Sequence, residues 1–294
     1  MTIIKEGIYM ERKNDLKDIL LYFLAVCFLA TGGIFVKLSK LPPMNTAFYR
    51  IVLSIPIIFP IVYKHLKSVD KKDIFIILAG GIFFGVDLAL WFLAFNYTSV
   101  ANANLLANLT SFTIIPVSYF LFKEKIPSKF LLSVIITVVG VAILLKGKAD
   151  PSQSSFFGDF ISFVASFFYA IFILTVYKSR DRVDSLTIIF IASFSTALSI
   201  FFIMIFKEGF VVPKTFNELW PLLGVAICSH VIGQGLMSYS LGKVRASLTS
   251  VLALSQPVIA AIYSFLLFSE KLTIIEILGI LITSVGIYYA KKTN

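Results

Sequence analysis

The sequence predicts an all-α membrane protein, with about ten transmembrane helices arranged as two five-helix inverted repeats. Composition is the first reason, because 58% of the residues are hydrophobic and 14% are charged, whereas a soluble domain has about 25% charged residues. The second reason is that the chain divides into about ten apolar runs, each near the ~20 residues that a spanning helix needs. The third is an internal repeat, in which the second half of the chain resembles the first.

The distribution of charge also favours a membrane protein over a nucleic-acid-binding one. The net charge is +10 and the mean hydropathy is +0.92. The basic residues lie at the ends of apolar runs, as in membrane proteins that are oriented by their cytoplasmic loops. Cys27 and Cys228 lie inside apolar runs, and we expect them to be reduced packing residues rather than a disulfide or a metal pair. No small-residue cleavage site follows the first run, so we expect a retained span.

We place the expected spans by the apolar runs and by the polar or proline-rich breaks between them. The intervening loops are short, so no soluble domain is expected between spans. The expected spans are residues 17–38, 44–63, 73–95, 99–122, 129–146, 157–177, 185–206, 218–240, 246–268 and 272–290.

The orientation of the chain follows from counting Lys and Arg in alternate loops. With the N-terminus inside, the inner segments hold 18 of these residues and the outer loops hold 6. Loops rich in Lys and Arg stay on the cytoplasmic side of a membrane. We therefore expect a multi-pass protein of the cell (inner) membrane with both termini in the cytoplasm.

The internal repeat is strongest between residues 94–145 and 240–291, which are offset by 146 positions and share 12 of 52 residues. Self-similarity at one offset indicates a duplication, and we expect one repeat over residues 1–148 and the second over residues 156–294. Because each repeat holds five expected spans, an odd number, the second repeat enters the membrane from the opposite side. An inverted repeat of this kind is common among secondary transporters.

Two segments carry a resemblance to a known family. The first is "WFLAFNYTSVANANLL" (91–106), followed by "LFKEK", and the second is "SYSLGKVRASLTSVLALSQPV" (238–258), followed by "LFSEKLT". Together with the "FYR" at 48–50, they resemble the EamA family of the drug/metabolite transporter (DMT) superfamily, which implies a transporter and more often export than uptake. The chain departs from the family pattern at one place. Pro257 lies thirteen residues before the second "EK" pair, but Ser111 lies there in the first half, so we expect the kink of the fourth span elsewhere.

Ionisable residues inside a membrane span are costly and are candidate functional residues by default. Arg50, Asp87 and His230 lie inside expected spans. At about 1.5 Å per residue, Arg50 lies about 10 Å and Asp87 about 12 Å below the outer ends of their spans, so the two can meet. Two interpretations are open. Either they form a buried ion pair that binds nothing, or Arg50 binds a carboxylate or phosphate of a substrate while Asp87 binds an amine or a proton.

Further polar residues extend this candidate site along the third and fourth spans. Trp91 is four residues after Asp87 and shares its helix face. There it can cover an apolar or cationic group of the substrate, or else anchor the helix at the membrane interface. Asn104 and Asn108 are also four residues apart. Because unpaired amides are costly in hydrocarbon, we expect them to face either a cavity or another helix.

The second half supplies its own candidate binding residues. His230, Gln234 and Ser238 are spaced by four and predict one polar stripe on the eighth span. His230 is expected either to relay protons or to bond to a neighbouring helix. Gln256 and Tyr169 are further candidates, with core packing as the alternative for Tyr169.

Other residues are expected to serve the structure of the bundle. The pairs Glu124-Lys125 and Glu270-Lys271 lie at helix ends, and we interpret them as caps or loop anchors rather than substrate ligands. Gly81 and Gly85 form a G-x-x-x-G motif, which lets helix backbones approach closely in a membrane.

These observations favour a secondary transporter of a small polar metabolite, most plausibly amino-acid-like, that works by alternating access around a central cavity. A nucleotide-sugar carrier and a lipophilic-cation or drug transporter of the same superfamily remain open. A membrane-embedded enzyme is a remote alternative, because the spans lack the clustered acidic or histidine ligands that such chemistry needs. We therefore expect no enzyme, no metal site and no cofactor.

The energy source and the partners are less constrained by the sequence. No Walker loop is present, which argues against ATP drive within this chain. Coupling to protons through Asp87 or His230 and uncoupled exchange both remain open. The expected partners are a small-molecule substrate, the lipid bilayer and, in a coupled mechanism, protons. We expect no nucleic acid, and a monomer or weak homodimer.

Overall fold

The computed structural model describes residues 15–94, 97–98, 103, 106–146, 155–269 and 271–293. All regular secondary structure within these ranges is helical. Nine helices in the described part of the chain are long and apolar enough to cross a membrane, and Thr110–Phe122 is a shorter apolar helix. The predicted all-α membrane fold is confirmed, and the helices match the expected spans to within a few residues wherever the chain is described.

Several spans consist of more than one helical segment. Pro43–Leu66, Phe216–Leu241 and Ala246–Phe268 are each a single span made of consecutive segments. The first half contains α1 (Leu16–Leu38), α2 (Pro43–Val52), α3 (Ser54–Leu66), α4 (Lys71–Ala94), α6 (Thr110–Phe122) and α7 (Ser128–Lys146). The second half contains α8 (Phe156–Ser179), α9 (Ser185–Lys207), α10 (Phe216–Gly224), the π-helix η2 (Val225–Gln234), α11 (Gly235–Leu241), α12 (Ala246–Ala253), α13 (Gln256–Phe268) and α14 (Ile274–Thr293).

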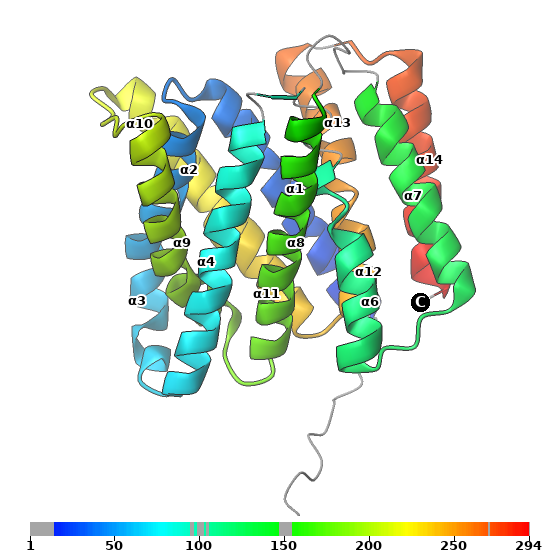
Figure 1. Cartoon of the computed structure of the whole chain (residues 1–294), viewed down its shortest axis with the longest axis horizontal. Helices are drawn as coiled ribbons and strands as arrows, with labels where there is room; N and C mark the ends of the chain where they lie inside the picture. The colour runs from blue at the N-terminus through cyan, green and yellow to red at the C-terminus, as the bar shows by residue number, and fades with distance from the viewer. Residues whose placement is uncertain are drawn as a thin grey trace, which may run out of the picture.

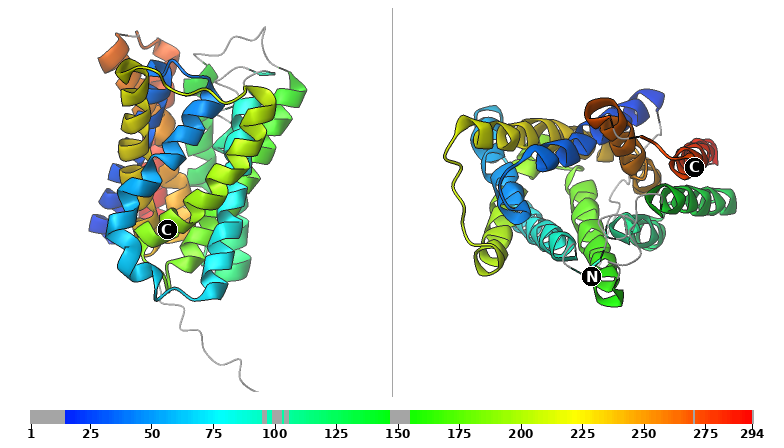
Figure 2. Two further views of the ribbon diagram at one scale, coloured as in Figure 1. Left: turned by 90° about the vertical axis from the view of Figure 1, so that its left-hand side faces the viewer. Right: turned by 90° about the horizontal axis from the view of Figure 1, so that it is seen from above.

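The helices run up and down between two ends of the bundle, which Figure 1 shows at the top and the bottom. We call the end with loops 39–42 and 208–215 the upper end, and the end with loops 67–70 and 180–184 the lower end. The C-terminal helix α14 descends to the lower end. Seen from above, α7 and α14 stand together at one side of the bundle (Figure 2).

The contact between α7 and α14 is the most extensive between any two helices of the described chain. Gly140 of α7 lies directly against Thr283, and Gly286 of α14 lies against Thr137. The two contacts are equivalent under the offset of 146 that relates the halves of the sequence. A side chain at either glycine would collide with backbone atoms of the partner helix, so these residues allow the two backbones to approach closely.

The G-x-x-x-G motif of α4 packs closely against α9, as the sequence predicts. Gly81 faces the Ala192 carbonyl and Ser195 of α9, and the hydroxyl of Thr196 donates a 2.8 Å hydrogen bond to the Gly81 carbonyl. Gly85 lies one turn further along α4, against the next turn of α9. This contact joins a helix of the first half to a helix of the second.

The fourth and ninth spans are interrupted at equivalent places. The helix before Thr110 ends in a turn at residues 108–109, and α12 and α13 are separated by a turn at residues 254–255. The offset between the two turns is again 146. The expectation that the fourth span bends elsewhere is therefore wrong. A proline is not required, because the hydroxyls of Thr110 and Ser255 each donate to a carbonyl three residues earlier and compete with the helical pattern.

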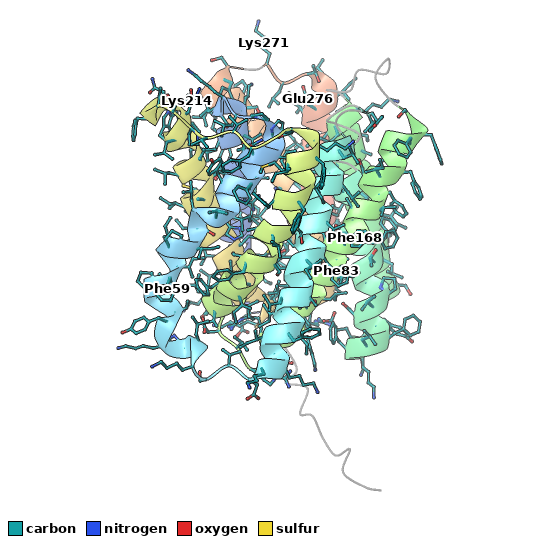
Figure 3. The ribbon with its side chains drawn as sticks, turned by 60° about the vertical axis from the view of Figure 1, so that its left-hand side comes forward. Phe59, Phe83, Phe168, Lys214, Lys271 and Glu276 are labelled. Carbon is teal, nitrogen blue, oxygen red and sulfur yellow. The ribbon has the colours of Figure 1, made fainter. Side chains whose placement is uncertain are left out.

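The outer surface of the bundle is apolar at mid-height. Figure 3 shows Phe59, Phe83 and Phe168 on this surface, with Lys214 and Lys271 at the upper end. Phe59 is 51% exposed. An apolar belt between charged ends is the surface that a lipid bilayer requires.

Replacing Gly140 with valine should wedge α7 away from α14. Overpacking of this kind costs about 1–3 kcal/mol, so we expect the Gly140→Val protein to unfold at a lower temperature in detergent. Gly33→Val is the matched control, because no atom lies within 4 Å of a side chain added at Gly33. Equal unfolding temperatures for the two variants would contradict the close α7–α14 contact.

Candidate functional site

Two adjoining cavities lie between the halves of the protein. The first, which we call the deep cavity, has a volume of about 160 Å³. The second, which we call the vestibule, has a volume of about 620 Å³. The residues that line both are Leu29, Arg50, Leu88, Trp91, Asn108 and Gln256.

The vestibule reaches the upper end of the bundle. Its lining includes Pro43 at the start of α2, Leu145 near the end of α7 and Ser264 in α13. Lys37, one residue before the end of α1, also lines it and holds its ammonium group 4.0 Å from the centre of the Phe268 ring. Most of the remaining lining is aliphatic or aromatic, so the vestibule is a largely apolar passage with a cation near its mouth.

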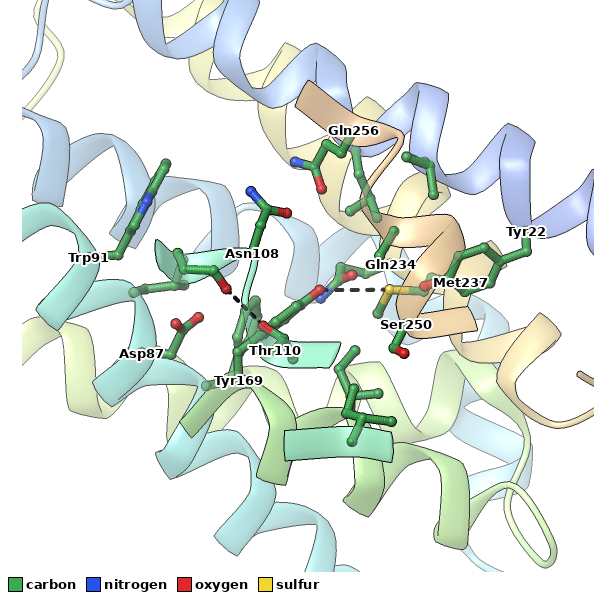
Figure 4. A pocket seen from close by; sticks show the side chains of 18 of the residues that line it. Tyr22, Asp87, Trp91, Asn108, Thr110, Tyr169, Gln234, Met237, Ser250 and Gln256 are labelled. Atoms are coloured by element: carbon green, nitrogen blue, oxygen red, sulfur yellow. Dashed lines mark hydrogen bonds between the residues drawn. The ribbon is translucent and has the colours of Figure 1, made fainter. Parts of the chain in front are cut away.

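The deep cavity has chemically different ends. Figure 4 shows Asp87 and Trp91 at one end and Tyr22 and Met237 at the other. Asp87 comes from α4 and Tyr22 from α1, so helices of the first half bound both ends. The polar side chains that Figure 4 labels between these ends are Asn108, Thr110, Tyr169, Gln234, Ser250 and Gln256.

Arg50 of α2 and Asp87 of α4 bring opposite charges to the same cavity. Within the described chain, no hydrogen bond or ion pair joins them, although their charges interact electrostatically. Asp87 is 7% exposed, and the Nε atom of Arg50 is buried without a hydrogen-bond partner. The two side chains therefore do not form a closed ion pair, and each keeps hydrogen-bonding capacity for a third group.

A third polar group in the cavity also lacks a partner. The side-chain carbonyl oxygen of Gln234 is buried, and no described group hydrogen-bonds to it. A buried polar atom without a partner is costly, and most such atoms in proteins are bonded to something. A solute that donates to Gln234 and accepts from Arg50 would remove this cost.

Seven of the ten binding residues predicted from the sequence line the deep cavity. Asn104 lies outside the described residues. The seven are Arg50, Asp87, Trp91, Asn108, Tyr169, Gln234 and Gln256.

His230 and Ser238 line neither of the two cavities. His230 bonds through Nε2 to the Ser193 hydroxyl of α9 at 3.1 Å, which confirms the interpretation of a histidine bonded to a neighbouring helix. The Ser238 hydroxyl donates to the Ser185 carbonyl at 3.5 Å. Of the three residues predicted to share one polar stripe, His230 and Ser238 both bond to α9, and Gln234 lines the deep cavity.

Some lining residues were missed by reasoning from the sequence. Ser250 carried a signal, because it aligns with Asn104 under the offset of 146. Tyr22, Thr110 and Met237 carried none, since each is unremarkable in a membrane helix and only the fold brings it to the cavity.

A buried carboxylate joins the two halves near the lower end. Glu124, which follows α6, accepts hydrogen bonds from the Tyr177 hydroxyl at 2.9 Å and from the backbone N–H groups of Ala246 and Ser247 at 3.0 and 3.2 Å. Ala246 is the first residue of α12. Glu124 thus caps a helix of the other half, which confirms its interpretation as a cap and fits the preference of helix N-termini for anions.

Two ion pairs add to this connection at the lower end. Arg182 lies 2.6 Å from Asp73 at the start of α4, and Lys243 lies 3.4 Å from Asp18 at the start of α1. Lys243 also donates to the Tyr239 hydroxyl at 2.6 Å. This hydrogen bond, helped by Asp18, raises the pKa of Lys243, so the ammonium group stays charged at neutral pH. The lower end is therefore fastened by charged contacts between the halves.

The deep cavity is lined mainly by uncharged residues. The described residues contain no group of three or more His, Cys, Asp or Glu side chains that could hold a metal ion. The deep cavity has one carboxylate, from Asp87, and one guanidinium, from Arg50. Most of the other lining residues are apolar or carry neutral polar groups.

An apolar helical bundle with a cavity between two halves is an architecture that many membrane transporters share. The chain belongs to the EamA-like transporter family, whose family model matches residues 16–146 and 156–290. This match confirms the family resemblance of the sequence and its division into two repeats.

Several relatives of this chain are named as transporters or exporters, and the similarity extends over most of their length. An uncharacterized transporter of Archaeoglobus fulgidus is 29% identical over 92% of this chain and 96% of its own. A probable amino-acid metabolite efflux pump of Escherichia coli is 22% identical over 92% of this chain and 94% of its own. The pseudopaline exporter of Pseudomonas aeruginosa is 22% identical over 86% and 89%. One solved crystal structure has the same fold, with a TM-score of 0.78 at 17% identity, over 93% of this chain and 96% of that one.

The cavity can be tested by its access to water-soluble reagents. In a Cys27→Ala/Cys228→Ala background, we expect Gln256→Cys to react with a charged methanethiosulfonate, because Gln256 lines both cavities. Ser238→Cys is the control and should stay unmodified, since Ser238 is buried and lines neither. Mass spectrometry of the intact protein measures both. Equal modification of the two cysteine variants would contradict the placement of residue 256 in a water-accessible cavity.

Proposed function

We propose that the protein is a secondary transporter that exports a small zwitterionic, amino-acid-like metabolite by alternating access. The observation that carries the proposal is the placement of Arg50 and Asp87 in one cavity without an ion pair between them. The guanidinium fork of Arg50 can donate two parallel hydrogen bonds to a carboxylate. Asp87 can accept from an ammonium group and balance its charge. A single zwitterion satisfies both side chains at once.

The names of the relatives support this substrate class and direction. One is named a probable amino-acid metabolite efflux pump and another an exporter. The sequence has no Walker loop, so the solute is moved by its own gradient, by exchange or by a coupled ion. Asp87 is the cavity residue that could carry a coupled proton, and uncoupled exchange needs no such step.

The arrangement of the halves supports alternating access. The reciprocal contacts of Gly140 with Thr283 and of Gly286 with Thr137 are what an inverted repeat with a two-fold pseudo-axis would make. The Lys and Arg bias assigns the lower end to the cytoplasm and the upper end to the outside. In this orientation the vestibule faces outward, and the Glu124 contacts hold the cytoplasmic side together. Rocking of the two halves would close the vestibule at the outer side and open the cavity at the cytoplasmic side.

A lipophilic cation is the second candidate substrate. The vestibule is large and mostly apolar, and Trp91 lies one turn from Asp87. An acid beside an aromatic ring suits a cation. Arg50 opposes this candidate, because its charge would repel a cationic solute that has no carboxylate.

Removing either charge should abolish transport. We expect Arg50→Ala and Asp87→Asn to lose amino-acid counterflow in proteoliposomes, because each leaves one end of the zwitterion and one buried charge without a partner. Size-exclusion profiles and unfolding temperatures show whether the variants fold. Asp181→Asn, which alters a 46% exposed carboxylate, is the control and should transport normally.

The same proteins distinguish the substrate classes by thermal unfolding, since a ligand that binds the folded state stabilises it. The panel holds amino acids, polyamines, nucleotide sugars and quaternary amines. We expect a stabilising shift with zwitterionic amino acids that disappears in Arg50→Ala and Asp87→Asn. Normal flux in either variant would remove that residue from the site. A shift with quaternary amines alone would favour the lipophilic-cation candidate.

Weakening the Glu124 contacts should favour the inward-facing state. Glu124→Gln removes the negative charge and presents an amide donor to N–H groups, and hydrogen bonds to a charged group contribute about 1.5–3 kcal/mol. We expect Gln256→Cys to react about tenfold more slowly from outside the cell in the Glu124→Gln background. Asp70→Asn, a change of an exposed carboxylate at the same end, is the control. Unchanged reactivity in both backgrounds would show that Glu124 does not hold the lower end closed.

A further inference from the structure

We propose that the transported solute carries an uncharged, apolar side chain, which points down the deep cavity onto a floor of apolar residues. The inference rests on the proposed function and deepens it by naming the side-chain class. The residues that form this floor are Tyr22, Phe84, Ile114, Ile173 and Met237.

The floor lies below the polar part of the cavity. Ile114 is six residues nearer the lower end than Asn108, and Ile173 is four residues nearer than Tyr169. At about 1.5 Å per residue these spacings correspond to about 9 and 6 Å. None of the floor residues lines the vestibule, so the floor closes the inner part of the cavity and not its entrance.

The floor and the charged groups are at different places in the cavity. In Figure 4, Tyr22 and Met237 lie at the opposite end from Asp87 and Trp91. Arg50 lines both the deep cavity and the vestibule, which places it where the two adjoin. A zwitterionic head group held by Arg50 and Asp87 therefore leaves the rest of the solute to extend toward the floor.

The floor offers no opposite charge to a charged side chain. The lining residues around it carry no charge apart from Arg50 and Asp87, which the head group already engages. The nearby hydroxyls of Thr110 and Ser250 each donate to the carbonyl three residues earlier, at 2.8 and 2.7 Å. An acidic or basic side chain placed there would lose its hydration without gaining an opposite charge, which is strongly unfavourable.

The volume of the deep cavity favours a side chain of moderate size. A cavity of ~150 Å³ lined by aliphatic and aromatic residues holds a benzene molecule, and the deep cavity has about 160 Å³. Phe84 packs against Phe172 with ring centres 4.4 Å apart, so this wall is held in place. Side chains of the size of leucine, methionine or phenylalanine fit this limit, with the head group between Arg50 and Asp87 in the deep cavity.

The test measures binding of a side-chain series to the full-length protein by thermal unfolding. The series is glycine, alanine, leucine, methionine, aspartate and lysine. We expect affinity to rise by about tenfold or more from alanine to leucine, and no shift with aspartate or lysine. In Ile114→Phe, which fills the floor, the ratio of leucine to alanine affinity should fall by about tenfold. Ile135→Phe, on the 54% exposed face of α7, is the matched control and should leave the ratio unchanged.

A second variant keeps the test decisive if Ile114→Phe does not fold. Ile173→Ala enlarges the floor, so we expect the ratio of phenylalanine to leucine affinity to rise. Unchanged ratios, or aspartate and lysine binding as tightly as leucine, would overturn the inference. In that case, binding that still requires Arg50 and Asp87 would leave the proposed function intact. Absence of binding by every amino acid would overturn both.

Discussion

A membrane interior offers no water to a broken helix, so every interruption of a span must be satisfied within the protein or beside a cavity. In this chain the interruptions gather around the deep cavity. They occur at Leu53 between α2 and α3, at residues 108–109, at residues 254–255 and along η2. Each has a polar residue of the cavity within it or within one turn of it, and these residues are Arg50, Asn108, Gln256 and Gln234. These four polar groups of the site thus come from places where the helices are interrupted, whereas Asp87 and Tyr169 lie in the continuous helices α4 and α8.

Serine hydroxyls donate hydrogen bonds to backbone carbonyls near these interruptions. Ser111 donates across the interface between the halves to the Ser250 carbonyl at 2.9 Å, and Ser54 donates to the Ile51 carbonyl at 2.6 Å. Pro56 lacks the N–H that would bond to the carbonyl of Val52, which explains why the second span breaks there. Interrupted helices can bend at such points with little loss of hydrogen bonding. Residues such as Arg50, near a break, can therefore change direction as the halves move.

The sequence was sufficient to predict the fold and many of the residues that line the deep cavity, for a physical reason. Long apolar runs and their breaks reflect the transfer of whole helices into lipid, which depends on composition and not on tertiary detail. Arg50 and Asp87 were likewise recognisable because a charge inside a span needs a special environment. The π-helix around His230 could not be predicted, because the choice between i→i+4 and i→i+5 bonding is made by packing against neighbouring helices. Apolar floor residues such as Met237 resemble every lipid-facing residue until the fold is known.

The two ends of the bundle differ although the halves are related. At the lower end, Tyr177 donates its hydroxyl to the buried Glu124 and packs its ring 4.7 Å from that of Phe122. The front parts of the halves align at an offset of 141, as Lys37 and Lys178 show. The position equivalent to Tyr177 is therefore Val36, which has no hydroxyl and lines the vestibule. A carboxylate that accepts several hydrogen bonds is held more firmly than any group facing an aliphatic side chain. The hydrogen bond from Tyr177 to Glu124 at the lower end therefore has no equivalent from Val36 at the upper end. This difference accounts for a cavity that reaches the upper end and stops short of the lower one.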